Sequence, residues 1–290
     1  MTKILGVNVD FEISKDQLLN RVSEYVKKDT YSLISTTNAE FIMDAQEDPE
    51  FMNILNEATL SIPDGAGLLY ANEYLNRVKK LKKGTFFMLK AFLEGLKLGF
   101  SRNEFNEKRL VGRELIYDLC DFAQQNNYSV FLLGGWEKDK WGRPKKDSGD
   151  ISGKAARRLS ELYPSLNIVG YASDFRRSEE DDVKTIEFIQ SKMVESGFKQ
   201  IDILFVAYNH KWQEKWIKRN ADKIPARVCL GIGGTLDYLA GSYMTTSPLF
   251  TKLNLEWLYK LLLQPWRIGR IIKVFPLFPL KVFLKVLKTH

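Results

Sequence analysis

Short apolar runs alternate with amphipathic stretches along most of the chain, and this alternation restricts the fold more than any other sequence feature. The apolar runs have the length and composition of buried strands, and the stretches between them repeat apolar residues with helical spacing. Strands that alternate with helices build parallel sheets covered by helices, so we expect a Rossmann-like α/β fold with a mostly parallel sheet. The expected strands are Ser32–Thr36, Leu60–Pro63, Ser129–Leu133, Asn167–Gly170, Asp202–Ala207 and Arg227–Gly231. The expected helices are Lys15–Lys28, Ala39–Gln46, Arg113–Gln125, Ser152–Leu162, Ser178–Ser196 and Lys211–Ala221.

Positive charge is concentrated in two segments. Residues 252–290 hold eight basic residues and one acidic residue, and residues 77–109 hold ten basic and three acidic ones, in a chain of formal net charge +7. Both segments are also rich in large apolar residues, as in the tail sequence IIKVFPLFPLKVFLKVL. This combination is typical of segments that bind anionic membrane surfaces, whereas nucleic-acid-binding arms seldom carry such runs. We therefore expect an anionic membrane surface as a partner and no nucleic acid.

The stretch Gly84–Phe100 has the periodicity of an amphipathic helix. Leu89, Phe92, Leu93, Leu96 and Phe100 fall on one face of it. This face could pack on the core or contact a membrane, and the cationic flanks favour the membrane. No run is long enough for a simple transmembrane helix, and the N-terminus lacks signal-peptide features, so we expect a peripheral protein at the cytoplasmic face of the cell membrane. The predicted organisation is a core over residues 1–245, with an amphipathic insertion at about residues 77–108, and a basic helical membrane-associating appendage over residues 246–290.

The composition excludes several kinds of site. The two cysteines, Cys120 and Cys229, form no zinc-binding pair, and two histidines cannot build a histidine cluster. A phosphate-binding GxxxxGK[ST] loop is absent, and so is the DxD triplet with which nucleotide-sugar enzymes commonly hold a divalent metal. We expect no metal and no cofactor.

Two candidate motifs follow expected strands, where ligands of open α/β sheets bind. In STTNAEF, Thr36 and Asn38 either cap the next helix or offer polar groups to a ligand. In IPDGAGL, Asp64 either caps a helix or acts as a general base beside a surface opened by glycines.

Three more candidate motifs follow the other strands. Gln213, in the stretch that contains His210, could donate to a sugar or a phosphate, while His210 itself is expected in a loop. Gly233 and Gly234 leave the backbone free to approach a diphosphate at a helix N-terminus, and Gly135 belongs to a similar glycine pair in LLGGW.

Together and in this order, these segments resemble the WecG/TagA/CpsF family of bacterial glycosyltransferases. The matching segments span about residues 32–270 and include TTNAEF, Asp48–Phe51, IPDGAG, KRLVGRELIYDL, VFLLGG, YPSLNIVG, QEKWI, GIGGTLDYLAG and LEWLYKLLLQPWR. The resemblance implies a metal-independent, inverting transfer of an N-acetylmannosamine-type sugar from a UDP donor. The implied acceptor is a polyprenyl-diphosphate-linked N-acetylglucosamine, used to make teichoic acid, capsule or other cell-surface polysaccharide.

The resemblance also implies roles for individual residues. Asp64 is the base, Thr36 and Asn38 line the sugar pocket, and Arg109 lies near the acceptor or the diphosphate. Gln213 matches a family glutamine, and Gly233, Gly234 and Asp237 belong to the segment that holds the nucleotide. Arg267 and Arg270 match tail arginines that close over the diphosphate, where guanidinium groups neutralise the leaving group without a metal.

Two departures from the family pattern keep alternatives open. Asn209 and Lys211 replace a glycine and a proline of the family loop, and Thr246 replaces an arginine ahead of the tail. The donor could therefore be another UDP-hexose, or the chain could be a catalytically silent nucleotide-binding scaffold at the membrane surface. The sequence leaves the oligomeric state open, a homo-oligomer included.

Overall fold

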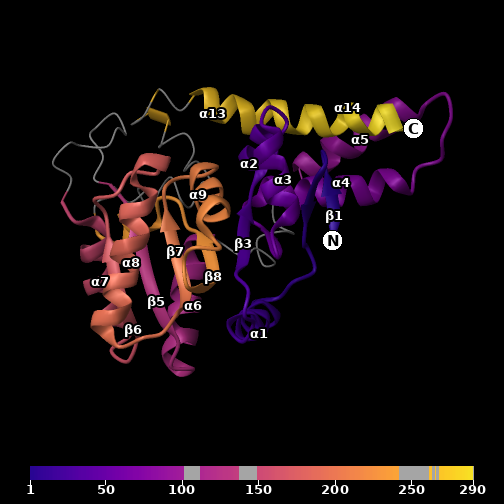
Figure 1. Ribbon diagram of the computed structural model, residues 1–290. Coiled ribbons are helices and arrows are strands. Elements are labelled where there is room, and N and C mark those ends of the chain that lie inside the picture. The colour runs from indigo at the N-terminus through magenta and orange to yellow at the C-terminus, as the bar shows by residue number, and fades with distance from the viewer. Residues whose placement is uncertain (101–111, 137–148, 242–260, 263–264, 266–267, 290) are drawn as a thin grey trace.

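A six-stranded parallel sheet lies at the centre of the computed structural model (Figure 1). Its strand order is β4-β3-β8-β7-β5-β6, and every neighbouring pair is parallel. All six expected strands are present and differ from the prediction only at their ends. They are β3 (Ser32–Thr37), β4 (Leu60–Pro63), β5 (Ser129–Gly134), β6 (Asn167–Ala172), β7 (Ile201–Ala207) and β8 (Ala226–Gly231).

The structure describes residues 1–100, 112–136, 149–241, 261–262, 265 and 268–289. The expected boundary between core and appendage, at residues 245 and 246, lies outside these ranges. Most of the family-like segment LEWLYKLLLQPWR lies outside them as well.

Helices cover both faces of the sheet, which explains why β5, β7 and β8 are largely apolar. On one face, Ile34, Leu132 and Phe205 pack in a cluster with α1 (Lys15–Val26), α6 (Gly112–Gln125), α7 (Ile151–Leu162) and α10 (Thr235–Leu239). On the other face, Leu33 and Leu204 pack with α8 (Asp182–Ser196), which a short 3-10 turn, η1 (Glu179–Asp181), precedes, and with α9 (Trp212–Asn220). Strands that are buried on both sides read as continuous hydrophobic runs rather than alternating ones.

A second lobe joins the β4 side of the sheet and has its own hydrophobic cluster. It contains the hairpin β1 (Thr2–Ile4) and β2 (Val7–Val9), which pair antiparallel, and the C-terminal helix α14 (Phe278–Thr289). Its other helices are α2 (Ala39–Ala45), α3 (Pro49–Glu57), α4 (Ala66–Lys79) and α5 (Phe87–Phe100). Phe278, Val282 and Val286 of α14 are buried in this cluster, so the tail helix packs on the lobe with one face.

The amphipathic helix α5 does not pack its predicted apolar face against the core. The predicted apolar stripe is largely exposed: Leu89, Phe92 and Leu96 have 53%, 50% and 46% of their surface accessible. The residues that α5 buries are instead Phe87, Ala91 and Leu98. On α14, Leu280 and Leu284 are exposed in the same way. The lobe therefore presents apolar side chains outward from two helices that lie side by side in Figure 1.

Within the described residues, no helix is long and apolar enough to cross a bilayer.

Candidate active site

The turns after β4, β3, β8 and β7 form the edge of the sheet at which the candidate residues gather. These strands are neighbours in the sheet and run in the same direction, so their carboxyl ends lie next to one another. Asp64 follows β4, Asn38 follows β3, Gly233 follows β8, and Gln213 lies in the first turn of α9, after β7. Residues far apart in the sequence are brought together by strand order alone.

Backbone contacts with the end of β3 hold the turn that contains Asp64. Thr37 pairs with Pro63 in the sheet, and the Asp64 N–H donates to the Thr37 carbonyl oxygen at 2.7 Å. The N-cap of α4 is Gly65, at φ +92°, and not Asp64. Asp64 therefore stands one residue before the N-cap of α4.

Asn38 serves as the N-cap of α2. Its Oδ1 accepts hydrogen bonds from the backbone N–H groups of Glu40 and Phe41, at 2.9 and 3.1 Å. The simpler of the two sequence interpretations, helix capping, therefore accounts for this oxygen. Thr36 is buried, and its hydroxyl donates to the Gly231 carbonyl oxygen at 3.4 Å, which ties the ends of β3 and β8 together.

Gln213 is buried, and both ends of its amide are used within the protein. Its Oε1 accepts the Gly233 N–H at 2.9 Å, and its Nε2 donates to Glu214 Oε1 at 2.8 Å. In this structure the side chain holds the glycine turn after β8. Gly231 makes this possible, because a Cβ there would stand 2.3 Å from Gln213 Nε2.

Glu214 is a site residue that sequence reasoning missed. It is fully buried, and its Oε2 has no hydrogen-bond partner among the described residues. Burial raises the pKa of this carboxyl to about 7, although the hydrogen bond from Gln213 acts in the opposite direction. A charged residue in the first turn of a helix normally faces water, so the sequence offered no signal of its burial.

The other predicted site glycines that the structure describes, Gly135 and Gly234, lie at the same edge of the sheet, as does Asp237. Gly135 follows β5 at φ +85°, and its N–H donates to the Ala207 carbonyl oxygen at 3.2 Å. A Cβ there would stand 2.9 Å from Ile151 Cγ2, so packing against α7 also requires glycine at this position. Gly234 is the N-cap of α10, and Asp237, 3% exposed, lies in the first turn of that helix.

The tail reaches this edge through two ion pairs with α2. Arg270, on α13 (Ile268–Ile272), places its Nε 2.5 Å from Glu40 Oε2. Lys273 begins the kinked π-helical turn η3 (Lys273–Leu277) and pairs with Asp44. Because Glu40 is only two residues beyond Asn38, the tail cations stand beside the end of β3.

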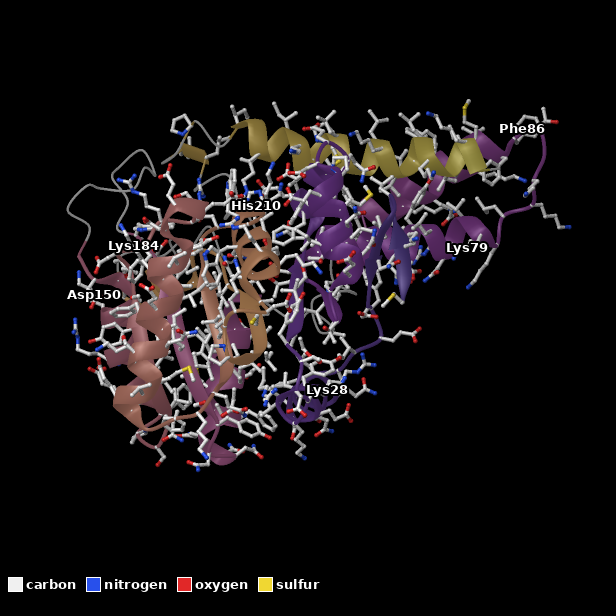
Figure 2. All side chains as sticks on the ribbon, viewed as in Figure 1. Lys28, Lys79, Phe86, Asp150, Lys184 and His210 are labelled. Atoms are coloured by element: carbon white, nitrogen blue, oxygen red, sulfur yellow. The ribbon has the colours of Figure 1, made fainter. Side chains whose placement is uncertain are left out.

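His210, labelled in Figure 2, joins the same cluster from the loop before α9. Its Nε2 lies 2.9 Å from Asp44 Oδ2 and 3.5 Å from Glu40 Oε1. Burial acts to raise the pKa of Asp44, but the hydrogen bonds from His210 and Lys273 outweigh it, and the pKa is lowered. The three side chains Glu40, Asp44 and His210 have the types and proximity of metal ligands. Their negative charge is nevertheless already balanced within the chain by the tail cations.

The loop before α9 differs in conformation from what the family pattern implies. Asn209 and Lys211 both have positive φ, +66° and +67°. A proline is fixed near φ −65°, so a proline at position 211 could not adopt this backbone. The departures at these two positions therefore change the loop that leads to Gln213.

Two predicted arginines, Arg109 and Arg267, lie outside the described residues. A separate hollow of about 420 Å³ lies at the opposite edge of the sheet, lined by residues such as Thr30, Gln200 and Arg227 that precede or begin strands. None of the predicted site residues that the structure describes lines it.

Comparison with known proteins gives one family and a consistent set of relatives. The sequence matches the family described as "Glycosyl transferase WecG/TagA/CpsF family" over residues 2–95 and 95–290. It is 25% identical over 280 residues to a Staphylococcus aureus (strain MRSA252) protein named N-acetylglucosaminyldiphosphoundecaprenol N-acetyl-beta-D-mannosaminyltransferase. That match covers 96% of this chain and 91% of the relative. A protein of the same name from Staphylococcus aureus (strain NCTC 8325 / PS 47) matches with the same identity and coverage.

Proposed function

The chain belongs to the WecG/TagA/CpsF family of glycosyl transferases, and from that premise we propose which sugar it transfers and to what. The donor is UDP-N-acetylmannosamine, and the acceptor is a polyprenyl-diphosphate-linked N-acetylglucosamine. The names of the Staphylococcus aureus relatives, which this chain matches over nearly its full length, support this pair of substrates. The product would enter the synthesis of teichoic acid or another cell-surface polysaccharide.

The observation that carries the proposal is the position of Asp64. It stands in the turn between β4 and α4, where its N–H donates to the Thr37 carbonyl oxygen at the end of β3. As the acceptor hydroxyl oxygen attacks the anomeric carbon of the donor, the Asp64 carboxylate accepts the hydroxyl proton. The new C–O bond forms on the face opposite the bond to UDP, which breaks and leaves UDP with the bonding electrons. The configuration of the sugar is thereby inverted.

The leaving UDP gains negative charge, which positively charged side chains and backbone N–H groups can stabilise without a metal. Arg270 is supported for this role because its ion pair with Glu40 holds it beside the end of β3. Arg109 and Arg267 are proposed for the same role on the family resemblance alone. Gly233 and Gly234 bring backbone to the start of α10, where a diphosphate is favoured. Thr36, Asn38, Gly135 and Asp237 are proposed to line the donor pocket.

Residues 246–290 are proposed to form an appendage that places the protein on the cytoplasmic face of the membrane, while residues 1–245 form the catalytic core. The exposed Leu280 and Leu284 of α14 and the exposed stripe of α5 support this assignment. Lys281 and Lys285 lie exposed on the same helix as the two leucines. Such a surface can enter the headgroup region while its lysines contact anionic lipids.

The experiment is a donor panel with the purified full chain and N-acetylglucosaminyl-diphosphoundecaprenol in detergent. UDP-N-acetylmannosamine should be used fastest, ahead of UDP-N-acetylglucosamine, UDP-glucose and a UDP-uronic acid. Faster turnover with another of these donors would show that the proposed sugar is wrong. Binding of UDP without turnover of any donor would favour the scaffold alternative instead.

A further inference from the structure

We propose that the groove between α4, α5 and the tail binds the prenyl chain of the lipid acceptor, next to its diphosphate. The proposal rests on the proposed function, since it concerns how the same substrate is held. The groove has a volume of about 540 Å³, within the range of about 300–1,000 Å³ that small-molecule sites have. Its lining is almost entirely apolar and comes from α4, α5, η3 and α14.

The groove begins at the candidate active site. Gly67, in the first turn of α4, lines it and lies three residues beyond the proposed base, Asp64. Val274 lines it from the tail, and the residue before it, Lys273, pairs with Asp44 on α2. One end of the groove therefore meets the catalytic turn and the tail cations, where a diphosphate would stand.

Away from the active site, the groove is bordered by the exposed apolar surface of the lobe. Phe92 and Leu280 line it, and 50% and 49% of their surfaces are accessible. The helices that carry them are the ones proposed to contact the bilayer. A chain that enters from the membrane could follow the groove without crossing water, which is the path that an amphipathic lipid with a reactive head requires.

Small residues on α5 leave the space in which such a chain would lie. Ala91, Gly95 and Gly99 line the groove at helical spacing. A Cβ at Gly95 would have Tyr74 Cε2 as its nearest neighbour, at 3.6 Å, and one at Gly99 would have nothing within 4 Å. Glycine at these positions is thus not required by packing inside the protein, and it lowers the stability of a helix.

Tyr74 gives a second, independent indication of a missing partner. It lines the groove and is 6% exposed, and its buried hydroxyl has no hydrogen-bond partner among the described residues. Burial raises its pKa to about 12, so the hydroxyl keeps its proton at neutral pH. Buried polar groups are normally paired, and since a prenyl chain carries no hydrogen-bonding atom, the partner of this hydroxyl would be the polar head of the lipid or a water molecule.

The occupant of the groove can be identified in steady-state assays that vary the length of the acceptor's prenyl chain. Acceptors with a geranyl chain and with an undecaprenyl chain on the same N-acetylglucosaminyl diphosphate are compared in detergent. The wild-type protein should have a lower KM for the undecaprenyl acceptor. The variant Gly95→Leu places a side chain in the groove. Its KM for the undecaprenyl acceptor should rise about tenfold, because one or two methylene groups of the prenyl chain would no longer be buried. The KM for the geranyl acceptor should change less, and the donor KM should not change.

The matched control is Leu93→Phe, which enlarges an exposed side chain on the same helix outside the groove. It should leave the preference for the longer chain intact. Equal KM values for both acceptors in the wild type, or an equal effect of the two variants, would overturn the groove assignment while leaving the proposed reaction in place.

A binding measurement tests the groove without turnover. Undecaprenyl phosphate in detergent should raise the Tm of the wild type but not that of Gly95→Leu. A diacyl phospholipid that raises the Tm equally would show a general lipid groove rather than a prenyl site, and would contradict the proposal. A Tm that rises equally in both proteins would contradict it as well.

Discussion

Replacing Glu214 with glutamine should remove a pH-dependent loss of stability. The carboxyl is fully buried and keeps one oxygen without a partner among the described residues. Glutamine has nearly the same shape and retains an oxygen that can accept the hydrogen bond from Gln213. The substitution therefore removes the ionisation and little else.

The size of the effect follows from the shifted pKa. Burial raises the pKa of Glu214 from 4.5 to about 7, and one pKa unit corresponds to about 1.4 kcal/mol, so the full difference is on the order of 3 kcal/mol. Between these two pKa values the folded protein keeps a proton that the unfolded chain has released. The free energy of unfolding of the wild type must then fall as pH rises from about 4.5 to 7, and this loss levels off at higher pH.

The assay is urea denaturation of both proteins at pH 5 and pH 8. The stability of Glu214→Gln relative to wild type should be greater at pH 8 than at pH 5, by about 2–3 kcal/mol. Glu187→Gln, which removes an exposed carboxylate from α8, serves as the control for the loss of one charge. A relative stability of Glu214→Gln that is the same at both pH values would refute the reasoning.

Three further predictions test the packing of the site, the docking of the tail and the membrane surface. Gly231→Ala places a Cβ 2.3 Å from Gln213 Nε2, so we expect a loss of about 1–3 kcal/mol in urea unfolding and a fall in turnover; unchanged values of both would contradict the described contact. Asp44→Ala leaves Lys273 unpaired, and limited proteolysis should cut the tail several-fold faster than in wild type; an unchanged rate would mean that this ion pair does not hold the tail. Leu284→Asp changes an exposed apolar side chain of α14, so binding to anionic vesicles in co-sedimentation should weaken about tenfold, while turnover in detergent stays the same; equal vesicle binding would exclude α14 from the membrane contact.

The sheet could be predicted from the sequence because its strands are buried on both faces. The strands β5, β7 and β8 therefore appear as largely apolar runs. The hairpin of β1 and β2 was missed because each strand has only three residues. The helix α3 was missed although its start signals were present, with Asp48 as N-cap and Pro49 in the first turn.

The orientation of α5 could not be predicted, because periodicity reveals an apolar face but not what covers it. In the structure this helix buries Phe87, Ala91 and Leu98 and leaves the predicted stripe exposed. Contacts between segments that are far apart in the sequence could not be predicted either. The carboxylates of Glu40 and Asp44 lie one turn apart on α2, yet nothing in that spacing indicates that Arg270 and Lys273 of the tail would pair with them.

The candidate site was predictable where strand order alone assembles it. Asp64, Asn38 and Gly233 were each expected after a strand, and parallel strands carry such residues to one edge. The role of Gln213 could not be predicted from the sequence, because only the structure shows that its amide forms hydrogen bonds with Gly233 and Glu214.

The most direct test of the account is the turnover of Asp64→Asn with UDP-N-acetylmannosamine and the lipid-linked acceptor, measured together with the affinity for UDP. A general base contributes about 100- to 10,000-fold to a rate. Turnover should therefore fall by about 100- to 10,000-fold, while the Kd for UDP stays the same. Turnover close to that of the wild type, with donor binding intact, would contradict the assignment of Asp64 as the base.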